Sequence, residues 1–198
     1  MVADRIRIPL FPLHNVLFPG GVLPLRIFEP RYLNMISACM KSGGGFGVAL
    51  ILSGNEVGEA ARTYDVGSYV EIVDWTLRDD GFLGVSVLCH GRFRILGTEV
   101  QADQLIRADV ERLEEQRPPL IPPQYAAAVN LLRDILTKVG GHYAELEPQY
   151  DDALWVSGRL AELLPIELLQ KQHLLQMDDP LQRLERLCAM WDCMESED

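Results

Sequence analysis

The sequence predicts an α+β protein, in which a β-rich N-terminal part is followed by an α-helical C-terminal part. Over most of residues 46–113 the apolar residues alternate with polar ones, which is the pattern of half-buried strands. Beyond the prolines of residues 117–123, apolar residues recur at helical spacing to the end of the chain. Paired prolines cannot continue a strand ladder, so they predict a boundary between residues 1–117 and 118–198.

The N-terminal part opens with an alternating segment, residues 5–10, that predicts a short strand. Pro9 within it indicates an edge position, because proline cannot donate a hydrogen bond to a sheet ladder. The prolines and glycines of residues 12–24 predict a rigid, shaped loop with short extended pieces. A helix is then expected to open at Pro30 and to end at the glycines of residues 43–45.

The segments that follow predict a small β-barrel or sandwich. Asp80-Gly81 is a tight-turn signal, which pairs residues 69–78 with residues 82–89 as a hairpin. Several short strands joined by turns are typical of such compact β structures. The expected strands cover residues 46–52, 66–75, 82–89, 92–96 and 105–113.

Four helices are expected in the C-terminal part, where they would form a helical bundle. Asp179 is expected to cap the last of them, because it precedes a proline that suits the first helical position. His173 lies on the apolar stripe of the third helix, so we expect it to be half-buried. The helices are expected to begin near Tyr125, at Asp151 or Asp152, at Pro165 and at Pro180.

The composition is that of an ordinary globular protein, with 48% apolar and 24% charged residues. The net charge of −11 argues against nucleic acid and anionic membranes as partners. Residues 1–50 nevertheless carry five basic residues against two acidic ones. No apolar run approaches the ~18 residues that a membrane-spanning helix needs, and the N-terminus lacks a signal-peptide pattern. We therefore expect a cytoplasmic protein.

Neither a cofactor nor a metal is expected. None of the four cysteines forms a C-x-x-C pair, and the four histidines lie far apart in the sequence. A phosphate-binding G-x-x-x-x-G-K-[ST] loop and a G-x-S-x-G motif are both missing from the sequence. No serine is marked by its neighbours as the partner of a catalytic lysine. The sequence therefore predicts a protein that is not an enzyme, with no catalytic residues.

Residues 9–32 are the most informative segment, with five prolines, three phenylalanines and a cluster of charged residues. One interpretation is a proline-shaped strand and helix start, in which Glu29 pairs with a neighbouring arginine. The other is that apolar side chains left over from the core line a groove for an extended partner, with Phe18 or Phe28 partly exposed. The candidate binding residues are Phe18, Pro19, Pro24, Phe28, Glu29, Arg31 and Tyr32.

This segment resembles the opening motif of the Lon protease N-terminal, substrate-binding domain family. The matching runs are Pro-Leu-His-Asn-Val-Leu-Phe-Pro-Gly, which starts at Pro12, and Leu-Pro-Leu-Arg-Ile-Phe-Glu-Pro-Arg-Tyr, which ends at Tyr32. Ser68 and Val70 depart mildly from the family's usual threonine and alanine. Further matches follow in chain order at Phe46-Gly47-Val48, Val66-Gly67, Glu71-Ile72-Val73, Gly91-Arg92-Phe93-Arg94-Ile95, residues 171–175 and Arg183-Leu184.

The resemblance covers nearly the whole chain and implies a PUA-like β-barrel followed by a helical subdomain, together one domain of the Lon N-terminal type. It also implies a free-standing binding module without the family's ATPase and protease domains. The implied partner is unfolded or extended polypeptide, or another protein, and the oligomeric state is left open. RNA binding by the PUA-like fold is the alternative, and a steep salt dependence of binding would support it.

Overall fold

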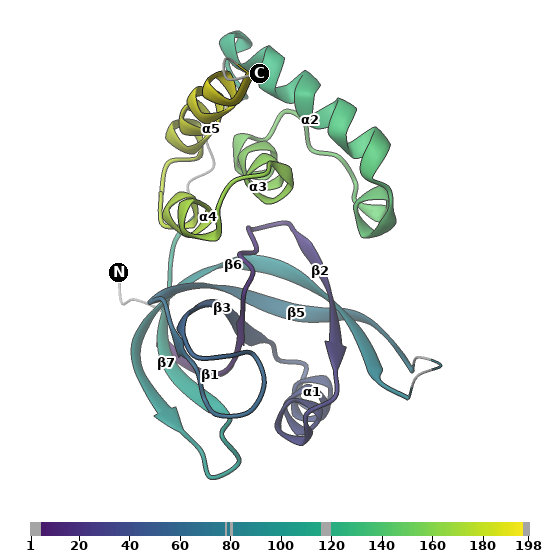
Figure 1. Cartoon of the computed structure of the whole chain (residues 1–198), viewed down its shortest axis with the longest axis vertical. Coiled ribbons are helices and arrows are strands. Elements are labelled where there is room, and N and C mark those ends of the chain that lie inside the picture. The colour runs from purple at the N-terminus through teal and green to yellow at the C-terminus, as the bar shows by residue number, and fades with distance from the viewer. Residues whose placement is uncertain (1–4, 78, 80, 116–119, 196–198) are drawn as a thin grey trace. The chain divides into compact units, whose positions relative to one another are not determined.

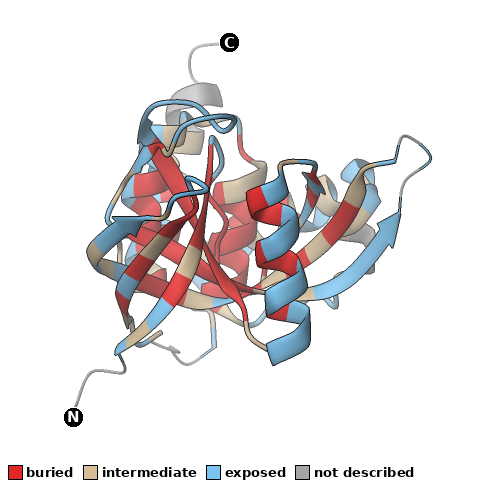
Figure 2. Ribbon diagram, turned by 90° about the horizontal axis from the view of Figure 1, so that it is seen from below, coloured by how far each residue is buried: buried red, intermediate tan, exposed pale blue. Residues whose placement is uncertain are grey.

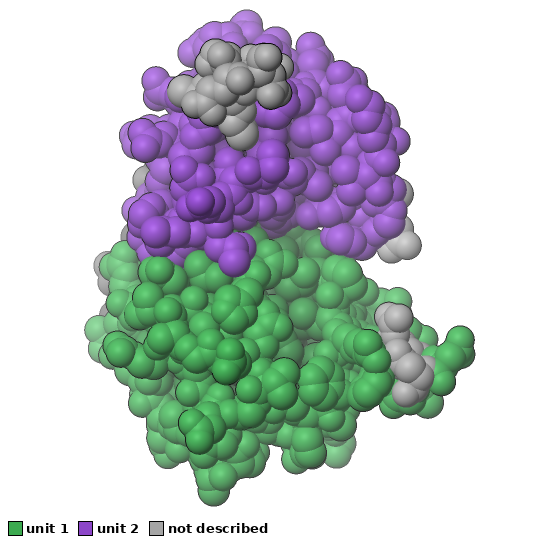
Figure 3. Space-filling view, in the orientation of Figure 1, with its two compact units in different colours: residues 1–114 green, residues 115–198 purple. Residues whose placement is uncertain are grey.

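The computed structural model describes residues 5–77, 79, 81–115 and 120–195. The chain divides into two compact units, residues 1–114 and residues 115–198, which are coloured separately in Figure 3. The predicted boundary at residues 117–118 lies outside the described residues. No helix among the described residues is long and apolar enough to cross a membrane.

The first unit is a seven-stranded sheet that closes on itself, with one helix (Figure 1). Along the sheet the strands run in the order β1, β7, β6, β5, β3 and β4, and β2 pairs with β6. A parallel pairing of β1 with β3 closes the ring into a barrel, while the other pairings are antiparallel. The elements are β1 (Arg5–Leu13), β2 (Val22–Ile27), α1 (Pro30–Ser42), β3 (Phe46–Ser53), β4 (Arg62–Thr63), β5 (Val66–Leu77), β6 (Leu83–Val100) and β7 (Ile106–Arg112).

The helix α1 has the bounds that the sequence predicts. Glu29 has extended backbone angles just before the helix, and Pro30 occupies the first helical position, where its missing N–H costs nothing. Gly43 ends the helix in the left-handed region with φ of 67°, and its N–H donates to the Cys39 carbonyl. Glycine adopts this conformation without a Cβ clash, which explains why the helix stops there.

Three strands differ from the prediction. Part of the predicted loop of residues 12–24 belongs to β2, because β6 supplies it with a hydrogen-bonding partner. The predicted strands over 82–89 and 92–96 are one continuous strand, β6, whose register shifts where it bends. The first strand extends to Leu13 and does not end at residue 10, while Pro9 lies at an edge as predicted, because it pairs with β7 and the β3 pairing starts only at Leu10.

The predicted hairpin is confirmed, because β5 and β6 pair antiparallel from Leu77↔Leu83 back to Val66↔Arg94. Asp80, which belongs to the predicted turn, lies outside the described residues. Buried residues lie along the strands of the sheet (Figure 2), and they form two apolar clusters. One cluster lies between α1 and the sheet and includes Tyr32, Ile36 and Val85, while a second includes Leu10 and Phe93.

Over its described residues, the second unit consists of helices joined by turns and loops. Asp152 caps α3, where its carboxylate accepts from the N–H groups of Leu154 at 2.7 Å and Trp155 at 3.3 Å. Asp179 accepts from the Leu181 N–H at 2.8 Å, so the predicted cap of the last helix is confirmed. The helices are α2 (Ala126–Val139), α3 (Ala153–Leu163), α4 (Leu168–Leu175) and α5 (Pro180–Glu195), with short 3₁₀ turns at Pro123–Tyr125 and Gly141–Glu145.

Two predictions for the helices are wrong. The third helix begins at Leu168 and not at Pro165, since Glu167 and Gln170 form a reciprocal capping box there. Leu164 has extended backbone angles, as expected of a residue before proline, so α3 ends there and the next helix begins only further along the chain. His173 is exposed, because Leu174 and Leu175 take the buried side of the short helix.

Candidate functional site

A groove of about 370 Å³ opens on the first unit, and residues 11–32 supply most of its lining. It lies between the end of β1, the strand β2, the start of α1 and the loop of residues 54–61 that connects β3 to β4. The residues that line it are Phe11, Leu13, Asn15, Leu23, Pro24, Leu25, Arg26, Ile27, Phe28, Glu29, Tyr32, Glu56 and Val57. We call this surface the Phe28 groove.

The floor of the Phe28 groove is apolar. Phe11 and Leu25 are buried in the core, and the Phe11 ring packs on the Tyr32 ring with centroids 4.3 Å apart. Burial raises the pKa of Tyr32 to about 12. An apolar floor of packed, buried side chains favours contact with aliphatic or aromatic side chains of a ligand.

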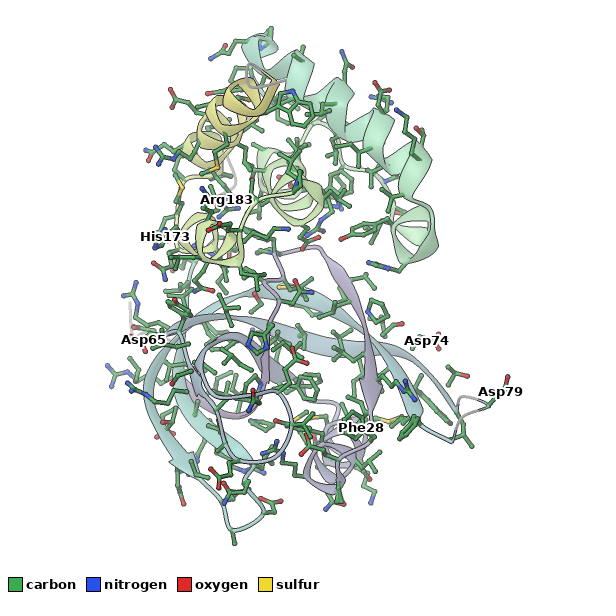
Figure 4. The ribbon with its side chains drawn as sticks, in the orientation of Figure 1. Phe28, Asp65, Asp74, Asp79, His173 and Arg183 are labelled. Carbon is green, nitrogen blue, oxygen red and sulfur yellow. The ribbon has the colours of Figure 1, made fainter. Side chains whose placement is uncertain are left out.

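Two exposed apolar side chains form the rim. Phe28 is 46% exposed and Val57 is 54% exposed. The Phe28 ring meets the Phe82 ring edge to face, with centroids 5.8 Å apart, and the Arg26 guanidinium lies 4.2 Å from the Phe82 centroid. Phe28 is therefore held in place from one side while its remaining surface faces solvent beside the start of α1 (Figure 4).

The loop of residues 54–61 is tied to the groove by its backbone and by one carboxylate. The His14 N–H donates to Glu56 Oε1 at 2.6 Å, and the Gly58 N–H donates to Glu29 Oε2 at 3.3 Å. These bonds bring Val57 to the groove although it is distant in sequence from the rest of the lining. The lining of the groove is therefore formed by this loop together with β1, β2 and α1.

Arg31 is a buried residue at the start of α1 that contacts residues next to the groove. Its side chain is 5% exposed, pairs with Glu29 at 3.1 Å and donates to the Gln104 carbonyl at 2.9 Å. The guanidinium also lies 4.5 Å from the centroid of the Tyr32 ring. The predicted pairing of Glu29 with a neighbouring arginine is confirmed, and Arg31 acts as a brace for the helix start.

The structure brings together only some of the predicted binding residues. Phe18 is fully buried and Pro19 is buried, so their assignment to an exposed groove is wrong. The Gly20 N–H donates to the Cys89 carbonyl at 2.8 Å, and this bond to β6 turns the preceding segment inward. Pro24, Phe28, Glu29 and Tyr32 line the groove. Their role in binding stays a prediction.

The sequence reasoning missed the contribution of Glu56 and Val57. Gly54 and Gly58 both have positive φ, and they could have been recognised as turn residues. Nothing in the local sequence, however, shows that this loop returns to the start of α1. The approach is set by bonds to His14 and Glu29, which are long-range contacts.

The apolar floor of the groove is bordered by charged residues of both signs, Arg26 on one hand and Glu29 and Glu56 on the other. Across the part of the chain that the structure describes, no three His, Cys, Asp or Glu side chains gather as metal ligands. Cys39 and Cys89 are buried, form no disulfide and do not line the groove.

A family model described as the ATP-dependent protease La (LON) substrate-binding domain matches residues 7–191. The chain therefore belongs to the LON substrate-binding domain family, as its opening motif predicted. A crystal structure of a Lon N-terminal domain protein from Xanthomonas campestris is 36% identical, with a TM-score of 0.77, and the match covers 93% of this chain and 98% of that one. The predicted α+β class, a β-sheet unit followed by helices, is confirmed by this likeness.

Curated relatives show the same relationship. The Lon protease of Cytophaga hutchinsonii is 24% identical over 93% of this chain, and that of Escherichia coli K12 is 27% identical over 98% of it. These matches span 24% and 25% of the relatives' own length, so the chain corresponds to about a quarter of each protease. The N-terminal domain of a Mycobacterium avium complex Lon protease shares the fold, with 16% identity and a TM-score of 0.64 over 92% of this chain.

Proposed function

We propose that the chain is a non-catalytic binding module that captures unfolded or extended polypeptide in the Phe28 groove. The observation that carries the proposal is the pair of exposed apolar side chains, Phe28 and Val57, above an apolar floor. Exposed apolar surface beside a concave site is typical of protein-binding surfaces. The family's description as a substrate-binding domain supports the same reading, since the substrates of a protease are polypeptides.

The charges at the groove support polypeptide over RNA. Glu29 and Glu56 lie at the groove beside the single basic residue of the lining, Arg26. A phosphate backbone would meet these carboxylates with repulsion, whereas a peptide offers both charges and neutral amides. We also propose the cytoplasmic location expected from the sequence, which suits cysteines such as Cys39 and Cys89 that are not joined in disulfides.

The test is the binding of fluorescently labelled, reduced and carboxymethylated lactalbumin, a permanently unfolded chain, followed by anisotropy. Phe28→Ala removes the aromatic rim, and we expect it to weaken binding about tenfold, as loss of an interface anchor does. Leu96→Ala is the matched control, because Leu96 is also 46% exposed but lies outside the groove. The control should bind like the parent.

Equal binding by Phe28→Ala and the parent would show that the groove is not the recognition site. A labelled single-stranded RNA in the same assay tests the alternative. Binding to RNA that falls steeply with salt, together with no binding to the unfolded protein, would reverse the proposal in favour of RNA.

A further inference from the structure

The strand β5 has an open edge over its second half. Its neighbour β3 pairs with it only from Val48↔Ser68 to Phe46↔Val70. Beyond Val70, all the pairings of β5 within the described residues are with β6, on the other side of the strand. On the side of β5 where β3 no longer pairs, residues 71–77 therefore have backbone N–H and C=O groups without a neighbouring strand. In Figure 1 this part of the hairpin projects beyond the barrel.

The side chains of this edge are unusually apolar for their exposure. Val73, Trp75 and Leu77 are 53%, 56% and 70% exposed. Natural proteins normally protect such edges with lysine, proline or a covering loop, because an open edge is a template for another strand. Residues 71–77 contain neither a lysine nor a proline, and the bulge in their pairing with β6, a further kind of edge protection, is confined to the step from Ile72 to Asp74.

A hollow lies beside the open edge. It measures about 260 Å³ and is bounded by residues 71–75 on one side and by the end of α1 on the other, including Met40 and Gly43. Trp75 pairs with Val85, and directly opposed residues in an antiparallel pair share a face of the sheet. Val85 belongs to the core beneath α1, so Trp75 continues that apolar face past the point where the helix covers it.

We propose that residues 71–77 of β5 form a second binding site, at which an extended polypeptide adds as a strand in line with β3. The main-chain bonds would be formed with the open edge, and a side chain of the added strand would enter the hollow beside Met40. This site is distinct from the Phe28 groove, and the inference holds whether or not that groove binds polypeptide. None of the residues that line one site lines the other.

The charges favour a foreign segment over a second copy of this chain. The only charged residues in the edge segment are Glu71 and Asp74, both acidic. Asp74 is exposed on the projecting hairpin, where Figure 4 labels it. Antiparallel pairing of two such edges would bring four carboxylates together, and the chain as a whole carries a net charge of −11. We therefore assign the site to neutral or basic segments that alternate apolar side chains.

The probe is the labelled peptide Lys-Thr-Val-Thr-Val-Thr-Val-Lys, together with two versions that carry N-methyl groups on alternate backbone amides. In an added strand, every second N–H points at the protein. One methylated version should therefore lose about tenfold or more in affinity, because it loses several main-chain bonds, while the other should bind like the parent peptide. Equal binding by all three peptides would overturn the proposal, since side-chain recognition alone does not depend on these N–H groups.

Protein variants locate the site. Trp75→Lys places a charge on the edge and should abolish peptide binding, whereas Val100→Lys is the matched control because Val100 is 52% exposed on the paired strand β6. All these variants are compared in a Phe28→Ala background, which removes the contribution of the Phe28 groove to peptide binding and so separates this site from the groove. Normal binding of the peptide by the Trp75→Lys variant would show that the assignment is wrong. The assignment to a foreign strand is also wrong if sedimentation shows that the parent is a dimer, and if the only effect of the substitution is to convert that dimer to a monomer.

Discussion

At the scale of single residues, exposure separates two phenylalanines that look alike in the sequence. Phe18 and Phe28 both follow an aliphatic residue in proline-rich surroundings. A bond from the Gly20 N–H to the Cys89 carbonyl turns the chain after Phe18, so that its ring enters the core. Phe28 lies between the end of β2 and the start of α1, and its side chain is partly exposed to solvent.

This difference gives a prediction for stability. Phe18→Ala should lower the free energy of unfolding by about 3–5 kcal/mol, because it removes a fully buried ring and leaves a cavity. Phe28→Ala should lower it by only about 1 kcal/mol, because nearly half of that side chain is already in water. Urea unfolding of both variants and the parent, followed by circular dichroism, measures the two changes.

Similar losses for the two variants would contradict the burial assigned to them. A large loss for Phe28→Ala alone would mean that its contact with Phe82 contributes more to the core than the exposed position indicates. In either case, binding measured with Phe28→Ala would have to be corrected for the unfolded fraction.

At the scale of the elements, local caps decide where the helices begin. Glu167 and Gln170 form a capping box for α4, and Asp152 accepts two backbone bonds at the start of α3. Both arrangements satisfy N–H groups that have no partner inside the helix. The predicted start at Pro165 was wrong because the capping box of Glu167 and Gln170 starts the helix three residues later, at Leu168, and satisfies its N–H groups better than a proline alone.

The cap of α3 can be tested with its own neighbour as control. Asp152→Ala should lower the free energy of unfolding by about 1 kcal/mol, since two N–H groups lose their acceptor. Asp151→Ala should change it by less than about 0.5 kcal/mol. Asp151 takes part through its backbone carbonyl, which accepts from the Ile121 N–H and survives the substitution.

Chemical denaturation of these two variants distinguishes the pair of caps that the sequence leaves open. A larger effect for Asp151→Ala than for Asp152→Ala would mean that the helix starts one residue earlier in solution. Equal effects would indicate a general response to lost charge at the helix start.

At the scale of the whole molecule, the first unit is complete as a fold. The β1–β3 pairing closes the ring, and both of its apolar clusters are built from residues of this unit alone. Every residue that lines the Phe28 groove also belongs to residues 1–114. A chain of that length can bury enough surface to fold without metals or disulfides.

We therefore predict that residues 1–114, produced alone, fold cooperatively and bind the unfolded test protein within about threefold of the full chain. Circular dichroism, thermal unfolding and the anisotropy assay measure this. A folded fragment that does not bind would mean that the helical unit supplies part of the site. An unfolded fragment would mean that the predicted division at residues 117–118 does not separate independent folding units.

The sequence by itself determined the parts of this protein whose signals are local. The bounds of α1, the cap at Asp179 and the β5–β6 hairpin follow from residues a few positions apart. Helix caps, turns and side-chain alternation depend on neighbours along the chain, so they can be read without the fold. The opening motif also led to the correct family.

Only the tertiary structure decided which surfaces are left open. The inward turn of Phe18 depends on a bond to β6, and the place of Val57 depends on bonds to His14 and Glu29. The bare edge of β5 exists because β3 stops pairing at Val70. Each of these features rests on contacts between segments far apart in the chain. Local patterns of hydrophobicity and turn residues do not specify such contacts, because many pairings of the same strands would satisfy the same alternation.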